Sequence, residues 1–206
     1  MYTLYYSPGT CALASHIALE EAGADYEARR IDFAAGEQQS AAYLAVNPKG
    51  RVPALVTTRG ILTETPAILA YIAQMFPGAA LAPNADIYAF AEMQAFNSYL
   101  CSTVHVAFAH GRRASRWADD AAAIEEMKRK MPETFAASLD LVERSMLRGP
   151  WVMGDAYTVA DAYLFTIFGW KDGAGLDGGR FPKLLDHRER MLQRPAVQRA
   201  MAAEAA

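Results

Sequence analysis

Cys11 is the residue whose type and position best suit covalent chemistry. It follows an apolar stretch, Leu4 to Tyr6, and a Ser-Pro-Gly turn, and a segment with a helical pattern begins there. A helix N-terminus carries partial positive charge and unpaired N–H groups, which favour a thiolate and lower a thiol pKa below about 8.5. We therefore expect a reactive thiol. From position alone the alternative is a buried cysteine that fills space, since free cysteine is among the most buried residue types.

A second candidate, His105, lies in a long helical segment of the C-terminal half. One face of this segment is apolar, and beside it runs a polar and sulfur-containing stripe that contains Gln94, Ser98, Cys101 and His105. Such a stripe is typical of a cleft wall and also of an ordinary boundary between core and solvent. The spacing alone leaves two interpretations of His105, a group that tunes or protonates a sulfur and a buried structural histidine.

Composition excludes several classes of function. The 206 residues are 52% hydrophobic, which is ample for a packed core, and 20 basic against 23 acidic residues give a formal net charge of −3. Without a basic excess, binding to nucleic acid or to an anionic membrane is disfavoured. The sequence shows no signal-peptide pattern and no membrane helix, so we expect a cytoplasmic protein. In that reducing compartment Cys11 and Cys101 should both be free thiols.

The elements that position these residues differ between the two halves of the chain. The first half predicts the order strand, helix, strand, helix, strand, strand, helix, which is that of a thioredoxin-like domain. A linker rich in proline and glycine follows, and the remaining signals are helical almost throughout. We therefore expect an α/β domain in residues 1–77 and an all-α domain in residues 86–206, with a site in the groove between them.

Several stretches along the chain together resemble the glutathione transferases, and specifically their bacterial beta class. They are the strand and turn of residues 4–11, Asn47 to Leu55, Leu62 to Ile68, His105, and Thr158 to Phe165. The resemblance covers both halves and implies the fold of that family, a thioredoxin-like N-terminal domain followed by an all-α C-terminal domain. It also implies an enzyme that uses glutathione, usually as a homodimer with its site near the interface.

The resemblance assigns catalytic residues. Cys11 matches the beta-class cysteine, Tyr6 matches the tyrosine beside it in the strand, and His105 matches the histidine that faces the cysteine across the groove. These three are the catalytic residues that the resemblance implies, and it implies no metal.

The resemblance also assigns residues that bind glutathione. The Val52-Pro53 bond is similar to the cis-proline of thioredoxin-like folds, where the preceding residue pairs with a peptide as an added strand would. Glu64 and Thr65 match the pair that holds the γ-glutamyl end, and a threonine hydroxyl with helix N–H groups suits its carboxylate. Thr65 is also expected to cap the helix that follows, with Pro66 as its first residue.

Three departures from the family pattern affect glutathione binding. Val106 stands where lysine is frequent, Ser98 where asparagine is frequent, and residues 36–39 lack the basic residue that often meets the glycyl carboxylate. We retain Ser98 and Arg51 among the residues expected to bind glutathione. The other basic residues able to substitute are Lys49, Arg112 and Arg113.

The second substrate would meet an aromatic and apolar lining if certain side chains of the helical half converge. These are Val106, Phe108, His110, Trp117 and Trp170. Aromatic residues at helical spacing are more often part of a core, and His110 has the alternative of a surface position. The lining, if formed, predicts small hydrophobic electrophiles.

The leading hypothesis is a glutathione transferase acting on such electrophiles in detoxification, with thiol–disulfide exchange through a mixed disulfide between Cys11 and glutathione. Exchange suits Cys11 better than conjugation, because two anionic sulfurs repel each other. The alternative is a protein of this fold that binds or regulates without turnover. A third hypothesis is a metal protein that uses Cys101 and His105, but two ligands are too few for a zinc site.

Overall fold

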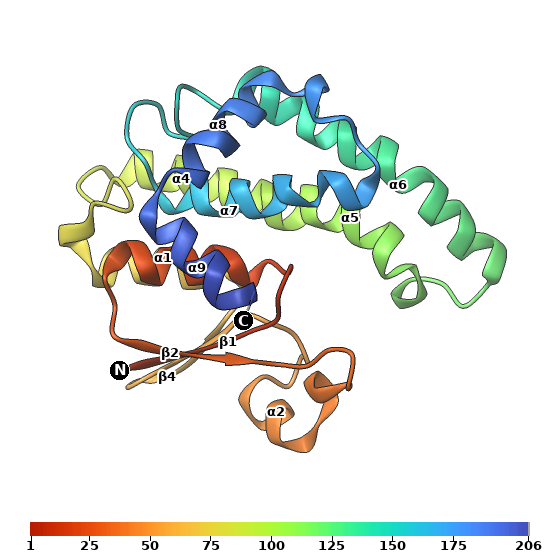
Figure 1. The fold of residues 1–206 in the computed structure, drawn as a ribbon, viewed down its shortest axis with the longest axis horizontal. Coiled ribbons are helices and arrows are strands. Elements are labelled where there is room, and N and C mark those ends of the chain that lie inside the picture. Colours follow the sequence, from red (N-terminus) through yellow and green to blue (C-terminus); the bar gives the residue numbers. More distant parts are fainter. Residues whose placement is uncertain (206) are drawn as a thin grey trace.

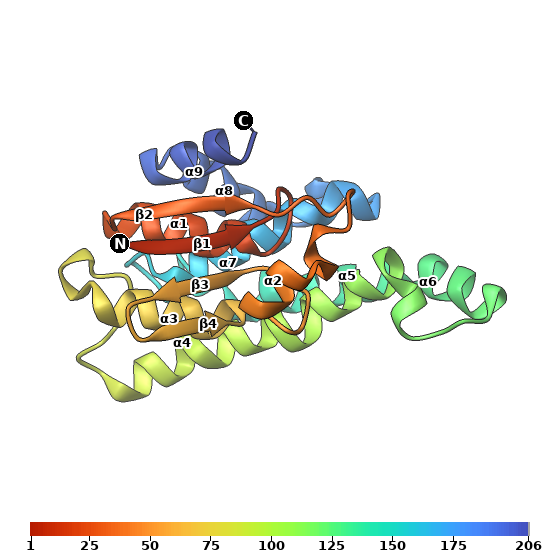
Figure 2. The same ribbon diagram turned by 90° about the horizontal axis from the view of Figure 1, so that it is seen from below.

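In the computed structural model, which describes residues 1–205, four short strands form a mixed sheet. They are β1 (Tyr2–Tyr6), β2 (Tyr26–Arg30), β3 (Ala54–Thr57) and β4 (Gly60–Thr63). The order across the sheet is β2-β1-β3-β4; β1 is parallel to β2 and antiparallel to β3, and β3 and β4 form an antiparallel hairpin. Helices α1 (Ala12–Ala22) and α3 (Thr65–Met75) lie between the sheet and the rest of the molecule, whereas the short α2 (Ala41–Val46) lies to one side (Figures 1 and 2).

The remaining helices form a larger layer on the far side of α1 and α3 (Figure 1). Helix α4 (Ile87–Tyr99) continues through a π-helical turn, Leu100–Val104, into α5 (His105–Arg112), and α6 (Ala121–Leu141) packs against α5. Helix α7 (Val159–Phe168) is buried along its whole length and packs on α1, and α8 (Pro182–Leu192) and α9 (Pro195–Ala205) complete the layer. Within residues 1–205 no helix combines the length and the apolar character needed to cross a membrane.

The order of elements predicted for the first half is confirmed, with differences at their ends. The alternation of residues from Tyr26 to Phe33 predicts a longer second strand, but this strand ends at Arg30. Residues 34–46, whose weak pattern predicts a loose helix, form a 3₁₀ turn and the short α2. Thr65 is the first residue of α3 and not its cap; Glu64 takes the cap position with a φ of 73°. The expected range 86–206 of the helical domain ends at residue 206, which lies outside the described residues.

A buried carboxylate holds the start of α7. The spacing Thr158-x-x-Asp161 predicts a capping box, and Asp161 completes it by accepting a hydrogen bond from the backbone N–H of Thr158 at 2.8 Å. Its other oxygen accepts from the backbone N–H of Val152 at 2.7 Å and lies 3.0 Å from Nε2 of His187 on α8. The side chain is wholly buried, so it joins α7, α8 and the preceding loop in one hydrogen-bonded group.

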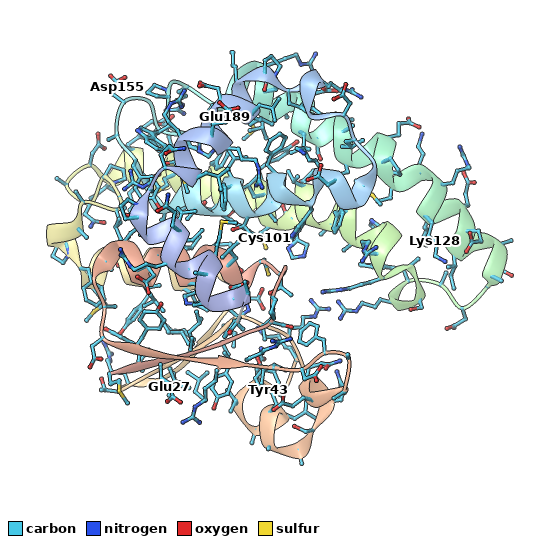
Figure 3. The ribbon with its side chains drawn as sticks, in the orientation of Figure 1. Glu27, Tyr43, Cys101, Lys128, Asp155 and Glu189 are labelled. Carbon is cyan, nitrogen blue, oxygen red and sulfur yellow. The ribbon has the colours of Figure 1, made fainter. Side chains whose placement is uncertain are left out.

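Replacing this carboxylate should destabilise the whole molecule. We expect Asp161→Ala to lower the free energy of unfolding by about 3–5 kcal/mol, because buried donors lose their acceptor. Urea denaturation followed by circular dichroism measures the change. The control is Asp155→Ala, an exposed carboxylate at the periphery of the helical layer (Figure 3), for which we expect less than about 0.5 kcal/mol. Equal losses in the two variants would contradict the role assigned to Asp161.

Candidate functional site

A cavity of about 530 Å³ lies between the sheet-containing part and the helical layer. One wall comes from residues 9–11 before α1, residues 50–53 before β3 and residues 64–65 at the start of α3. The opposite wall comes from the helical segment of residues 101–117 and from residues 163–173 around the end of α7. The size suits a small extended ligand.

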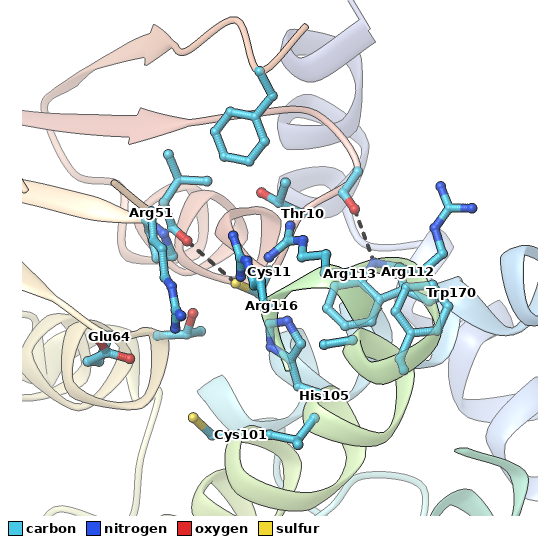
Figure 4. A pocket seen from close by; sticks show the side chains of 18 of the residues that line it. Thr10, Cys11, Arg51, Glu64, Cys101, His105, Arg112, Arg113, Arg116 and Trp170 are labelled. Carbon is cyan, nitrogen blue, oxygen red and sulfur yellow. Dashed lines mark hydrogen bonds between the residues drawn. The ribbon is translucent and has the colours of Figure 1, made fainter. Parts of the chain in front are cut away.

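Cys11 lies on the first wall, immediately before α1. Its side chain is 9% exposed, and its thiol donates a hydrogen bond to the carbonyl oxygen of Val52 at a sulfur–oxygen distance of 3.7 Å (Figure 4). Burial raises the pKa of the Cys11 thiol, and the nearby Thr65 hydroxyl and Arg113 charge only partly oppose it. The sequence-based expectation of a lowered pKa is therefore wrong in this structure, because burial outweighs the helix N-terminus.

The peptide segment beside Cys11 is fixed by α2 and the residue after it. The carbonyl oxygen of Arg51 accepts hydrogen bonds from the Tyr43 hydroxyl at 2.7 Å and from the Asn47 amide at 2.6 Å. The Val52-Pro53 bond that follows is cis, as the resemblance implied. Within residues 1–205 the Val52 N–H has no hydrogen-bond partner, so this backbone is available to pair with a bound peptide.

The start of α3 offers an anion site on the same wall. Thr65 is buried and lines the cavity, and the first N–H groups of α3 are not used within the helix. Glu64 lies next to it, and its carboxylate pairs with the ammonium group of Lys49. Lys49, one of the basic residues expected to meet a ligand carboxylate, is therefore engaged by Glu64 and by the hydroxyl of Thr63 at 2.8 Å.

His105 faces Cys11 from the opposite wall (Figure 4). Its ring stands edge-on to Trp170, with ring centroids 4.7 Å apart. Burial, together with the positive charges of Arg113, Arg51 and Arg116, lowers the pKa of His105 to about 4. At neutral pH the imidazole is uncharged, so it can donate one N–H hydrogen bond to a sulfur but has no imidazolium proton to transfer.

Trp170 joins the two walls. Its indole N–H donates to the carbonyl oxygen of Gly9 on the first wall at 3.1 Å (Figure 4). Phe108 stacks on the same indole with centroids 5.0 Å apart. Val106 and Trp117 also line the cavity, as expected, whereas His110 is outside the lining and packs against Trp117 with its ring tilted by 45°.

Two residues expected at the site are not brought to the cavity. Tyr6 is buried behind the first wall, where its hydroxyl donates to the carbonyl oxygen of Ala203 in α9 at 3.4 Å. Ser98 is exposed and does not line the cavity. The π-helical turn after α4 explains why Ser98 lies away from the cavity. A π-helix has more residues per turn than an α-helix, so Ser98 and His105 do not share the side-chain stripe predicted for an uninterrupted α-helix.

Sequence reasoning missed two residues of the site, Arg116 and Tyr163. Both line the cavity. Arg116 completes a group of arginines with Arg112 and Arg113, and three arginines within five residues are a signal visible in the sequence. Tyr163 lies in the buried α7, where its hydroxyl is near enough to Cys101 to affect the pKa of that thiol, and no local pattern indicates this proximity.

The structure gives no support to a metal site formed by Cys101 and His105. Both residues line the cavity, but residues 1–205 contain no group of three or more histidine, cysteine or acidic side chains placed to hold a metal ion.

Comparisons with known proteins agree with this architecture. Residues 1–74 match the family model for the N-terminal domain of glutathione S-transferase, and residues 100–195 match that for its C-terminal domain. A glutathione S-transferase of Escherichia coli O157:H7 is 34% identical over 204 residues, covering 98% of both chains.

Two solved structures are similar over almost the whole chain. A glutathione transferase homolog from Sulfitobacter, described with bound glutathione, is 46% identical with a TM-score of 0.95, covering 98% of both chains. A beta-class glutathione S-transferase of Sphingomonas chungbukensis is 36% identical with a TM-score of 0.86 over the same shares. These similarities confirm the fold and the family that the sequence led us to expect.

The electrostatics of the cavity predict how His105 titrates. We expect the midpoint of its imidazole NMR signals near pH 4 in the free protein, so the ring is neutral throughout pH 6–8. Arg113→Gln should raise this midpoint, because it removes the largest charge that opposes protonation. Arg59→Gln, in the exposed β3–β4 turn, should leave it unchanged. The His105 signal is identified by its loss in His105→Gln, and a wild-type midpoint near 6.5 would contradict the burial and charge assigned to this ring.

Proposed function

Because this chain belongs to the glutathione S-transferase family, we propose that it binds glutathione in this cavity. It uses Cys11 for glutathione-dependent thiol–disulfide exchange. It also transfers glutathione, more weakly, to small hydrophobic electrophiles. One observation carries the proposal. The Cys11 sulfur lies 3.7 Å from the carbonyl oxygen of Val52, and the backbone N–H of this residue is free to pair with a peptide. A peptide held by Val52 would thus have its own cysteine next to Cys11.

Each part of glutathione has a matching group in the cavity. The Val52 backbone suits the cysteinyl peptide unit, and Thr65 with the N-terminus of α3 suits the γ-glutamyl carboxylate. Arg51 suits the glycyl carboxylate, which has no partner in residues 36–39. The bound glutathione described for the Sulfitobacter homolog supports glutathione as the ligand.

The proposed exchange has two steps. The Cys11 thiolate attacks the glutathione sulfur of a disulfide R–S–S–G, the S–S bond breaks, and the released R–S⁻ takes up a proton, leaving Cys11 in a mixed disulfide with glutathione. A second glutathione thiolate then attacks the glutathione sulfur of that bond, giving oxidised glutathione and free Cys11. Arg113 is the cavity cation that lowers the pKa of Cys11, so formation of the attacking thiolate depends on it.

The raised pKa of Cys11 favours a second candidate function, conjugation without covalent catalysis. A protonated Cys11 thiol does not repel the thiolate of glutathione and can donate a hydrogen bond to it. In that case glutathione itself would be the nucleophile toward the electrophile, and Cys11 would only orient its sulfur.

We also propose the organisation that accompanies this activity in the family. Residues 1–77 form the glutathione-binding domain and residues 86–206 line the second-substrate site of a cytoplasmic homodimer. Exposed apolar side chains near the junction of α3 and α4 support the dimer, since Met75 is 51% exposed, Ile87 87% and Tyr88 76%. The two free thiols are compatible with a reducing compartment.

Replacing Cys11 tests the exchange mechanism. With oxidised glutathione, the wild-type protein should gain one glutathione in its intact mass, and Cys11→Ala and Cys11→Ser should gain none. We expect the glutathione-dependent exchange rate to fall by at least about 100-fold in both variants, because the serine hydroxyl forms no disulfide. The matched control is Cys101→Ser, which removes the other cysteine of the cavity and should retain both the adduct and the exchange.

The same variants separate the two candidates. If Cys11→Ala abolishes the adduct but leaves exchange unchanged, covalent catalysis by Cys11 is wrong. If conjugation falls strongly in Cys11→Ala but is retained in Cys11→Ser, the thiol acts as a hydrogen-bond donor and the second candidate holds.

A further inference from the structure

Four arginines line the cavity without carboxylate partners. Arg51 lies on the first wall, where glutathione is proposed to bind. Arg112, Arg113 and Arg116 lie on the opposite wall, at the end of α5 and in the turn after it (Figure 4). Among residues 1–205, no acidic side chain is within ion-pair distance of these four guanidinium groups. Several basic residues on the surface, in contrast, are paired with carboxylates. The acidic residue in the lining, Glu64, is already paired with Lys49.

Three of these arginines, Arg51, Arg113 and Arg116, are close enough to repel one another. The pKa of Arg116 is lowered by partial burial and by the charges of Arg113 and Arg51, and the same three cations suppress protonation of His105. Like charges held together in a partly enclosed site are destabilising unless an anion joins them. The cavity is therefore built for more negative charge than its own residues supply.

Glutathione does not supply enough of this charge. At neutral pH it carries two carboxylates and one ammonium group, so even as a thiolate its net charge is about −2. Against four guanidinium groups this leaves about two positive charges in the cavity. Arg51 is the arginine placed for a glutathione carboxylate. The excess positive charge therefore lies with Arg112, Arg113 and Arg116 on the opposite wall, here called the α5 wall.

The α5 wall combines these cations with aromatic surface. Phe108, Trp117 and Trp170 line the same wall as Arg112, Arg113 and Arg116, and Phe108 and Trp170 stack on each other. Arginine binds carboxylates and sulfonates through paired hydrogen bonds, and aromatic rings favour a flat apolar body. The two features together describe a ligand with an apolar ring system and an anionic group.

We propose that the second substrate of this cavity carries a carboxylate or sulfonate on an aromatic body, and that Arg113 and Arg116, with Arg112, bind that group. This inference rests on the proposed function in placing glutathione on the opposite wall. It narrows the second substrate from any small hydrophobic electrophile to an anionic one, and it makes the three arginines determinants of specificity.

A pair of fluorescent probes tests the inference without turnover. The probes are 8-anilinonaphthalene-1-sulfonate and N-phenyl-1-naphthylamine, which share one aromatic skeleton and differ by the sulfonate. Both are titrated into protein saturated with S-methylglutathione, so that the glutathione anion sites are already filled. We expect the anionic probe to bind at least about tenfold more tightly than the neutral one.

Matched variants assign this preference to the arginines. In Arg113→Gln/Arg116→Gln the anionic probe should lose at least about tenfold in affinity and the neutral probe should be little changed. Arg113→Lys/Arg116→Lys should retain most of the preference, since the charge is kept. The control Arg59→Gln removes an exposed arginine outside the cavity and should behave as wild type.

Three results would overturn the inference: equal affinity for the two probes, a preference that survives the double glutamine variant, or a preference seen in the free protein that disappears when S-methylglutathione is bound. The last would show that all four arginines serve glutathione. If S-methylglutathione does not bind at all, the proposed function fails, and the probe preference of the free protein and its loss in the glutamine variant then decide the inference alone.

Discussion

The packing of α7 against α1 is the contact on which the site depends. Helix α7 is buried along its length, its start is held by the Asp161 carboxylate, and just beyond its end the Trp170 indole donates to the carbonyl oxygen of Gly9. Since α1 begins immediately after Cys11, this packing sets the position of the thiol relative to His105 on the opposite wall. The core therefore determines the geometry of the cavity, and the loops only complete it.

Burial and positive charge act in opposite directions on the groups of the cavity. Burial raises the pKa of the Cys11 thiol while Arg113 lowers it, and for His105 burial and the arginines both disfavour the charged form. An anion bound to the arginines weakens their effect on both residues. The pKa of the buried Cys11 thiol is thus coupled to what the cavity holds. An anion bound at Arg113 therefore raises the pKa of the Cys11 thiol further and raises the pKa of His105.

Much of the fold of this protein can be predicted from its sequence. The strand and helix order, the cis bond before Pro53 from the family resemblance, the capping box of Asp161 and the convergence of Cys11 with His105 are all found in the structure. The errors arise where distant parts meet. The pKa of Cys11 rises because the packed fold buries it, and Ser98 leaves the predicted stripe at a π-helical turn that its residue types do not reveal.

A crystal structure of the protein with reduced glutathione at neutral pH would test the proposed site directly. We expect the cysteinyl unit to pair with the Val52 backbone and the γ-glutamyl carboxylate to lie at Thr65 and the start of α3. The glutathione sulfur should lie beside Cys11 and face His105. Glutathione bound elsewhere, or bound in the cavity with its sulfur directed away from Cys11, would contradict this proposal.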